Sequence, residues 1–548
     1  MKTKAKIRKQ GNAIVIVEEI LKHVIDIIAC IYMLLILVGL PFYFEEGFSH
    51  IGTDKSYFYR QCITKTAYVL VPVVICYLLV KGIRYYMDKR QGKLSYLKKK
   101  WQEIFSVTDF FALMYGSSVV LSYLFSPYKE QALWGATGWY MGMIPQLSLI
   151  AVYFLISRMW RRRIWLLALV LPASAIVFGL GFLNRFGIYP IDMVVENVQF
   201  ISTIGNINWY CGYFVTVFYG GFCLLWETEE GKSWVKLLLM AYVMIGFATL
   251  VTNGSSGGIL TMVVMFLIFF VLSAGDSRRM EMFWLEMAGF SVVCLVIFVL
   301  RSVGILHITY IETTTEVFTN SALAILMTIV SVAIYRMLVF ARRRNRYEQR
   351  IAVMVTKLIC GGVLGIVICL ILLIVVNTLS GGKIAQMAGM PENSFLTFCP
   401  TWGSNRGATW MAGLMCFQQQ GIVYKTFGVG PDCMTEFLYR QGSEELIQMV
   451  RTCFGTARLT NAHNEWITVL VNTGLLGFVS YVGMMTTAIK RLVSSREHNM
   501  IAAAIGFCMI AYTVNNMFSF QQSMNVSTMF VLFGAGEGFL RAEKEVRK

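Results

Sequence analysis

The sequence predicts an all-α integral membrane protein, a polytopic bundle of about 14 transmembrane helices, and three observations predict it. Of its 548 residues, 57% are hydrophobic and only 14% are charged, whereas soluble domains carry roughly 25% charged residues. The mean hydropathy is +0.61. The apolar residues also gather into stretches of about 20, the length that crosses a bilayer as a helix. Soluble, disordered, collagen-like and disulfide-scaffold chains are excluded by this composition.

Each of the 14 apolar stretches is interpreted as one span. They cover residues 24–44, 66–80, 106–125, 138–157, 164–184, 207–226, 234–252, 257–274, 282–300, 320–340, 355–379, 464–489, 499–520 and 525–540. The connection between the eleventh and the twelfth, residues 380–463, is far longer than the others. We therefore divide the chain into residues 1–379 with helices 1–11, the loop 380–463, and residues 464–548 with helices 12–14 and a tail.

The positive charges alternate from one connection to the next. Of the 48 Lys and Arg residues, 33 fall on the side of the bundle that holds both termini, and 12 fall on the opposite side. Cytoplasmic loops of membrane proteins carry this excess. We therefore expect a multi-pass protein of the cytoplasmic membrane with both termini in the cytoplasm. The net charge of +17 then indicates topology and contact with anionic membrane lipid, and nucleic acid is not an expected partner.

The loop 380–463 lies on the outer side in this topology and is too apolar for a disordered segment. Residues 408–419 carry apolar side chains at helical spacing, and residues 432–454 read as helical in pieces. We expect a small folded extracytoplasmic cap, rich in large apolar side chains such as Trp402, Trp410, Phe417, Tyr424, Phe427, Phe437, Tyr439 and Phe454.

Four polar segments reach the same outer surface. They are residues 202–209, residues 252–258, residues 404–410 with 426–432, and residues 461–466 with 472–477. Polar groups at the mouth of a helical bundle are costly, so they are candidates for function.

The motifs in these segments resemble a known family. Residues 462–477 (AHNEWITVLVNTGLLG) resemble the His-Asn and Gly-Leu-Leu-Gly signature of the O-antigen ligase and Wzy-type polysaccharide polymerase family. Residues 205–208 (GNIN) resemble its Gly-Asn-x-Asn element. Residues 406–410 (RGATW) and 428–431 (GVGP) resemble its Arg, Trp and Gly-x-Gly-Pro stretch. The likeness covers roughly residues 190–490, and the large outer loop lies in the family's place.

The resemblance implies a membrane glycosyltransferase that works outside the cytoplasmic membrane. Such enzymes transfer a glycan from a polyprenyl-pyrophosphate (undecaprenyl-pyrophosphate-type) donor to an acceptor that is a glycan or lipid-linked, without metal or other cofactor. Further polysaccharide-assembly proteins are conceivable partners. The motifs do not separate polymerase from ligase, although the size of the outer loop favours a polymerase that holds a growing chain.

Two residues are the catalytic candidates. Arg406 matches the family motif, and its planar guanidinium is suited to a leaving pyrophosphate; the alternative is an ordinary loop arginine in a surface ion pair. His463 matches the family histidine, and an imidazole can take the proton of the acceptor hydroxyl; the alternative is a structural or capping histidine.

The candidates for substrate binding are the remaining polar or aromatic residues of the motifs. Asn206 and Asn208 offer paired amides, either for sugar hydroxyls or for tying a helix end. Glu465 could orient an acceptor, or it could be a solvated glutamate in the first turn of a helix. The full set is Asn206, Asn208, Ser255, Ser256, Trp410, Asn464 and Glu465.

Two further features bear on these assignments. Gly428 and Gly430 are expected to serve turn geometry rather than to cradle phosphate. Family members commonly carry Ser-Arg-Gly where this chain has residues 255–257 (SSG). The second pyrophosphate-binding arginine is therefore absent from that turn, and the candidates to replace it are Arg185, Arg440, Arg451 and Arg458.

Two other functions remain as alternatives. A lipid-linked oligosaccharide flippase would have two similar halves, charged residues at mid-membrane and short outer loops, and none of these is evident. A noncatalytic scaffold for envelope assembly would tolerate the absent arginine.

Overall fold

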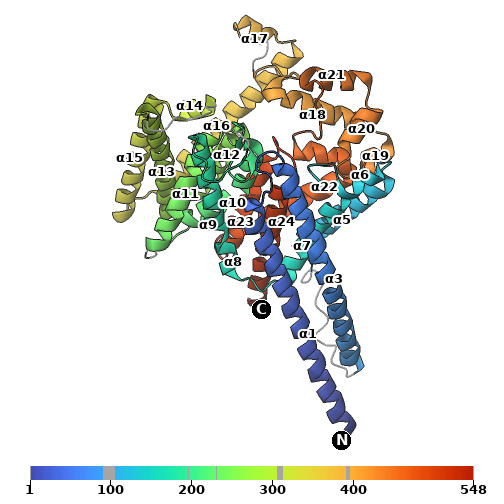
Figure 1. Cartoon of the computed structure of the whole chain (residues 1–548). Coiled ribbons are helices and arrows are strands. Elements are labelled where there is room, and N and C mark those ends of the chain that lie inside the picture. The colour runs from blue at the N-terminus through green and yellow to red at the C-terminus, as the bar shows by residue number, and fades with distance from the viewer. Residues whose placement is uncertain are drawn as a thin grey trace.

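The computed structural model describes residues 2–90, 105–194, 197–229, 231, 233–304, 313–390 and 395–546. Helices dominate these residues, and two short strands pair antiparallel with Phe200 opposite Asn206. The chain begins with α1 (Lys2–Leu34), η1 (Leu35–Gly39), α2 (Leu40–Phe42) and α3 (Ile51–Arg90). Both termini lie at the lower end of the molecule in Figure 1, where α1 and α3 extend beyond the other helices.

The central part of the chain forms most of the bundle. It contains α5 (Val107–Phe125), α6 (Lys129–Trp134), α7 (Met143–Met159), α8 (Ile164–Ala168), α9 (Val170–Arg185), β1 (Phe200–Ile201), β2 (Gly205–Asn206), α10 (Ile207–Trp226), α11 (Ser233–Asn253), α12 (Ser256–Ser273), α13 (Ser277–Ser302), α14 (Thr313–Phe318), α15 (Ser321–Arg343) and α16 (Gln349–Leu379). Side chains cap the first turns of several helices in the chain, including Ser106, Asn206, Asp276, Asn320, Ser443, Asn464 and Asn499.

The last third of the chain supplies the cap and three more long helices. The cap helices are α17 (Lys383–Met387), α18 (Trp402–Gln419), α19 (Ile422–Phe427), α20 (Met434–Gln441) and α21 (Glu444–Phe454); α22 (Glu465–Ser494), α23 (Met500–Asn515) and α24 (Ser523–Val546) follow. The helices expected within residues 408–419 and 432–454 are therefore confirmed.

Eleven described helices are long and apolar enough to cross a membrane. The other three predicted spans correspond to α7 and α23, which are shorter apolar helices, and to α24. A polytopic helical membrane protein is thus confirmed in its coarse form. Ion pairs hold α24 in the bundle, because Glu537 bonds to Arg491 of α22 at 2.7 Å and Arg541 bonds to the buried Asp109 of α5.

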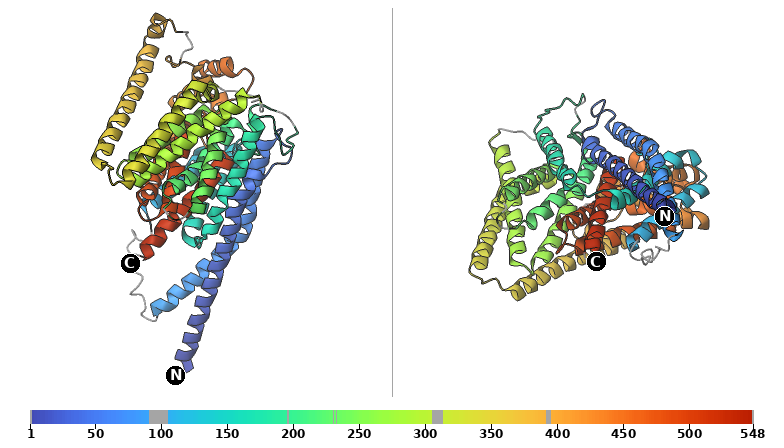
Figure 2. Two further views of the ribbon diagram at one scale, coloured as in Figure 1. Left: turned by 90° about the vertical axis from the view of Figure 1, so that its left-hand side faces the viewer. Right: turned by 90° about the horizontal axis from the view of Figure 1, so that it is seen from below.

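The helix α10 forms the centre of the bundle. Its aromatic side chains Tyr210, Tyr213, Phe214 and Phe218 are all buried, and they pack on neighbouring helices. The apolar residues of α16 are exposed instead, and this helix stands at the edge of the bundle, in gold in Figure 2.

The cap has an apolar core of its own, and this core includes residues from outside 380–463. Cys416, Val429, Phe437 and Leu446 are buried together with Tyr128 and others from the segment between α5 and α7. The cap lies at the upper end of Figure 1, opposite the termini. The folded unit is therefore built from the long loop and the α6 segment together.

A kink in α22 joins the cap to the bundle. Gly474 has φ 65° and ψ −172°, a conformation that only glycine adopts readily. The kink frees backbone carbonyls one turn earlier, and these accept hydrogen bonds from the cap: the Val429 N–H donates to Val471 and the Gly430 N–H donates to Asn472, each at 3.2 Å. The two glycine-rich motifs of the sequence thus meet at one backbone contact.

Candidate active site

The start of α18 presents Arg406 to a cavity. Three consecutive residues, Gly403, Ser404 and Asn405, have positive φ and form a sharp turn just before Arg406. The Arg406 guanidinium donates only weak hydrogen bonds, to the Phe518 carbonyl at 3.3 Å and to the Gly403 carbonyl at 3.4 Å. No carboxylate among the described residues forms an ion pair with it, and burial lowers its pKa. The alternative of a surface ion pair is therefore wrong for Arg406.

Arg406 lines a cavity that is here called the arginine cavity. Its other walls come from Trp402 and Phe518, and from Ser256 and Leu260 at the start of α12. A helix N-terminus carries a partial positive charge and a guanidinium carries a full one, so the two together favour an anion. Leu260 is 39% exposed, which places one wall of the cavity at the apolar surface of the bundle.

His463 lies in the turn before α22, with φ 45°. Its backbone N–H donates to the Asn461 side chain at 2.9 Å, and its ring packs edge-on against Phe520 with 5.1 Å between centroids. Burial and the positive charge of Arg406 lower the pKa of His463 to about 4. The imidazole is therefore neutral near pH 7, close enough to Arg406 to feel its charge, and able to accept a proton.

Glu465 is buried, with 1% exposure, so its interpretation as a solvated first-turn glutamate is wrong. Its carboxylate accepts hydrogen bonds from Tyr481, Asn516, Tyr512 (2.9 Å) and Gln521 (3.4 Å). Asn516 and Gln521 flank the connection between α23 and α24. This connection carries the Phe518 carbonyl that Arg406 contacts and the Phe520 ring that His463 contacts, so Glu465 positions the partners of both candidate catalytic residues.

The predicted amides mainly serve helix ends. Asn206 accepts from the Asn208 N–H at 2.9 Å as the cap of α10, and Asn464 accepts from the Ile467 N–H at 3.1 Å as the cap of α22. Asn208 instead accepts from the Ser255 hydroxyl at 3.2 Å. Of the two predicted serines, Ser256 is exposed and lines the arginine cavity, whereas Ser255 faces α10.

Trp410 supports the arginine cavity from behind. Its ring packs against Phe398, Trp402 and Phe518, with centroids 5.6 to 6.5 Å apart. The indole nitrogen of Trp410 is buried without a hydrogen-bond partner among the described residues. Trp410 thus fixes two aromatic side chains that line the cavity.

Among the four arginines considered as replacements, Arg185 lies at the turn in question. It is 1% exposed and donates to the Asn253 carbonyl at 2.5 Å. Arg440 and Arg458 instead pair with Glu436 of the cap, at 2.7 and 3.2 Å. Arg185 therefore places positive charge beneath the start of α12, although its guanidinium is engaged with backbone carbonyls.

Gly428 and Gly430 have φ values of 87° and 124°, which confirms their interpretation as turn glycines. Their N–H groups donate to the carbonyls of Tyr424 and Asn472, at 2.7 and 3.2 Å. The same groups are thus not available to cradle a phosphate.

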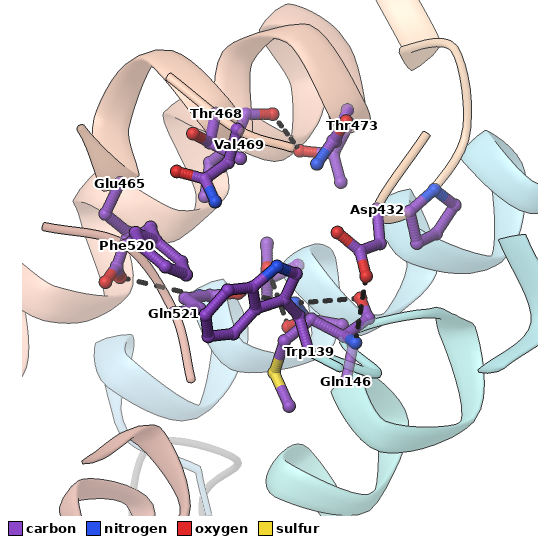
Figure 3. Close-up of a pocket in the computed structure, with 14 residues that line it drawn as sticks. Trp139, Gln146, Asp432, Glu465, Thr468, Val469, Thr473, Phe520 and Gln521 are labelled. Atoms are coloured by element: carbon purple, nitrogen blue, oxygen red, sulfur yellow. Dashed lines mark hydrogen bonds between the residues drawn. The ribbon is translucent and has the colours of Figure 1, made fainter. Parts of the chain in front are cut away.

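A second cavity adjoins Phe520 on the side of α5, α7 and α22. Trp139, Gln146, Asp432 and Gln521 line it (Figure 3). Of these residues the sequence points only to Asp432, which closes the polar segment 426–432, whereas Trp139 and Gln146 lie in a predicted span. We call this space the Asp432 cavity.

The comparison with known families bears on the same region. Residues 313–482 match the family model described as O-antigen ligase. The match covers 170 of the 548 residues, about a third of the chain. The matched region contains Arg406, Trp410, Asp432, His463 and Glu465, and it ends in α22 shortly after the kink, so the resemblance to this family is confirmed. No curated protein shows significant similarity to the chain.

Proposed function

We propose that the chain is a membrane glycosyltransferase that transfers a glycan from a polyprenyl-pyrophosphate carrier to an acceptor sugar at the outer face of the cytoplasmic membrane. The observation that carries the proposal is Arg406, a half-buried cation in the region that matches the O-antigen ligase family, with no carboxylate partner among the described residues. It faces the arginine cavity together with the start of α12. A pyrophosphate at this place would supply the missing negative charge.

In the proposed reaction an acceptor hydroxyl oxygen attacks the anomeric carbon of the donor sugar. The bond from that carbon to the phosphate oxygen breaks, and the polyprenyl pyrophosphate leaves with the electron pair. Arg406 stabilises the charge that grows on the leaving group, and the neutral His463 takes the hydroxyl proton. The pKa of His463 is low partly because of Arg406, so the negative donor would raise it and make His463 a stronger base.

The remaining residues have supporting roles in this proposal. Ser256 would contact the phosphates from the start of α12, while Asn208 and Ser255 would offer polar atoms to the donor sugar. Asn206, Asn464 and Trp410 would maintain the helix ends and the aromatic wall around them. The exposed Leu260 at the cavity rim supports entry of the polyprenyl chain from the lipid side.

The orientation belongs to the proposal as well. Fourteen spans would place both termini in the cytoplasm and the cap outside, consistent with the distribution of Lys and Arg. Within this class we favour a polymerase over a ligase, because the cap is large enough to hold a growing chain.

The test replaces the chromosomal gene by the Arg406→Ala or His463→Ala variant and compares the cell-surface glycan. Loss of a transition-state cation costs about 10²- to 10³-fold in rate, so long-chain glycan should fall by a similar factor at equal expression. His50→Ala is the matched control, because its side chain is exposed, and it should leave the glycan unchanged.

The accumulating intermediate identifies the reaction. Single lipid-linked repeats outside the membrane would indicate a polymerase, and lipid-linked long chains that never reach their anchor would indicate a ligase. Repeats trapped inside would support a flippase instead. Normal glycan from both well-expressed variants would contradict the catalytic roles and favour a scaffold.

A further inference from the structure

The Asp432 cavity is separated from the arginine cavity by the connection between α23 and α24. Phe518 of this connection lines the arginine cavity, whereas Phe520 and Gln521 line the Asp432 cavity. The Phe520 ring packs edge-on against two others, with ring centroids 5.1 Å from His463 and 4.8 Å from Trp139. The candidate base therefore lies at the boundary between the two spaces.

The Asp432 carboxylate is fixed in position by the backbone. The N–H groups of Ala136 and Met141 both donate to Oδ2, at 2.7 and 3.2 Å, and the Gln131 side chain donates to the Asp432 carbonyl at 2.7 Å. Within the described residues, Oδ1 accepts no hydrogen bond. Burial raises the pKa of Asp432 to about 6. One oxygen of a firmly held carboxylate is thus left for a ligand that donates hydrogen bonds.

Amide side chains line the opposite wall. Tyr115 donates to Gln146 at 3.0 Å, Gln146 donates to Gln521 at 2.5 Å, and Gln521 donates to Glu465 at 3.4 Å. Each amide has both donor and acceptor atoms, and this series of hydrogen bonds ends on the buried Glu465 carboxylate. The cavity therefore combines two carboxylates, four side-chain amides and the rings of Trp139 and Phe520 (Figure 3).

This combination selects one class of ligand. A sugar presents hydroxyl groups that donate to carboxylates and amides, and an apolar ring face that packs on aromatic side chains. A phosphate would be repelled by Asp432 and Glu465, and a polyprenyl chain would leave Oδ1 of Asp432 without a hydrogen-bond donor. The cation that suits a pyrophosphate, Arg406, lines the other cavity.

We propose that the Asp432 cavity binds one monosaccharide unit of the acceptor glycan, with Asp432 bonded to a hydroxyl and Trp139 against the sugar ring. The assignment to the acceptor rests on the proposed function. It places the acceptor sugar and the donor pyrophosphate on opposite sides of the Phe518–Phe520 wall, with His463 beside the path between them. Asp432 and Trp139 are then specificity-determining residues.

Binding of free sugars tests the proposal without any need for turnover. Methyl glycosides of glucose, galactose, mannose, rhamnose and N-acetylglucosamine are each offered to the full-length chain in lipid nanodiscs, and contact is detected by saturation-transfer NMR. We expect at least one glycoside to bind the wild type. Asp432→Asn and Trp139→Leu should weaken that binding about tenfold or more, because each removes a buried partner of the sugar.

Matched variants separate binding from folding. Trp139→Phe keeps an aromatic ring and should retain most of the binding. Trp165→Leu removes a tryptophan that is 52% exposed at the periphery and should change nothing. In Asp432→Asn, the side-chain carbonyl can still accept from Ala136 and Met141, so its thermal unfolding midpoint should stay near that of the wild type.

A second arm identifies the sugar as acceptor. With the host's own lipid-linked repeat as donor, Asp432→Asn should raise the KM for the acceptor glycan and leave the KM for the donor unchanged; a rise confined to the donor KM would overturn the assignment. The sugar site itself would be overturned if no glycoside bound the wild type, or if Asp432→Asn and Trp139→Leu bound the glycoside as tightly as the wild type does. Glycoside binding together with normal surface glycan from Arg406→Ala cells would contradict the proposed function alone.

Discussion

At the scale of single residues, two buried groups beside the candidate site respond to acid in opposite directions. The pKa of His463 is lowered to about 4, so between pH 6.5 and 4 the unfolded chain binds more protons and acid destabilises the fold. The pKa of Asp432 is raised to about 6, so between pH 6 and 3.8 the folded chain binds more protons and acid stabilises it. In the wild type the two effects partly cancel.

Substitution should separate the two effects. Relative to the wild type, the thermal unfolding midpoint of Asp432→Asn should fall more steeply as the pH is lowered from 6.5 to 4.5, because the loss from His463 is no longer offset. The midpoint of His463→Gln should rise relative to the wild type over the same interval. Unfolding scans of detergent-solubilised protein measure both slopes, with His50→Gln as control. Equal slopes in the three variants would contradict the environments assigned to these groups.

The sequence predicted the residues that carry recognisable motifs and missed those that carry only geometry. Arg406 and His463 were predicted from family motifs, and the structure brings them close to each other. Asp432 and Trp139 are 293 positions apart in the numbering of the chain, so their meeting depends on how the cap packs against α5 and α7. The sequence singles out Glu465 but not its burial, because the four side chains that donate to it lie 16 to 56 positions further along the chain.

At the scale of elements, the contact between the cap and the kink of α22 depends on two glycines. A Cβ on Gly428 would lie 2.1 Å from the Asn472 carbonyl oxygen, and a Cβ on Gly474 would lie 2.4 Å from the Thr426 carbonyl oxygen. Both residues also have positive φ, 87° and 65°. Backbone atoms on both sides leave no flexible side chain to give way.

Gly428→Ala and Gly474→Ala should therefore each destabilise the protein by at least about 2 kcal/mol, the sum of backbone strain and steric overlap. Lower thermal unfolding midpoints in detergent would show this. Gly365→Ala in α16 is the matched control, since a Cβ there meets nothing within 4 Å, and it should be neutral or slightly stabilising. If Gly474→Ala were as stable as the wild type, the close contact between the cap and the kink of α22 would be contradicted.

The helices could be predicted from the sequence because the thickness of a bilayer sets the length of their apolar stretches. The kink of α22 could not be predicted in this way. Nothing in the apolar pattern of α22 distinguishes Gly474 from Gly477, which keeps helical dihedrals. Equally, α6 was interpreted as part of a short connection, although Tyr128 and Ala132 belong to the apolar core of the cap. Both features arise from contacts between segments that are distant in the sequence.

At the scale of the whole molecule, the proposed chemistry requires that the two cavities and the cap face the outside of the cell. The termini lie at one end of the bundle and the cap at the other (Figure 1). Arg342 and Arg343 end α15 and Arg344 follows it, and this arginine-rich segment lies on the side of the termini in the predicted topology. The predicted orientation of the protein, which is based on charge, therefore decides on which side of the membrane the site lies.

Reporter fusions test this orientation at two matched positions. Alkaline phosphatase, which is active only outside the cytoplasm, and green fluorescent protein, which fluoresces in the cytoplasm, are each fused after Asn345 and after Thr456. Both positions lie in exposed connections, one after α15 and one after α21. We expect fluorescence without phosphatase activity at Asn345 and phosphatase activity without fluorescence at Thr456, because the arginine-rich connection resists translocation. The reverse pattern would place Arg406 and His463 in the cytoplasm, where an acceptor glycan outside the membrane could not reach them.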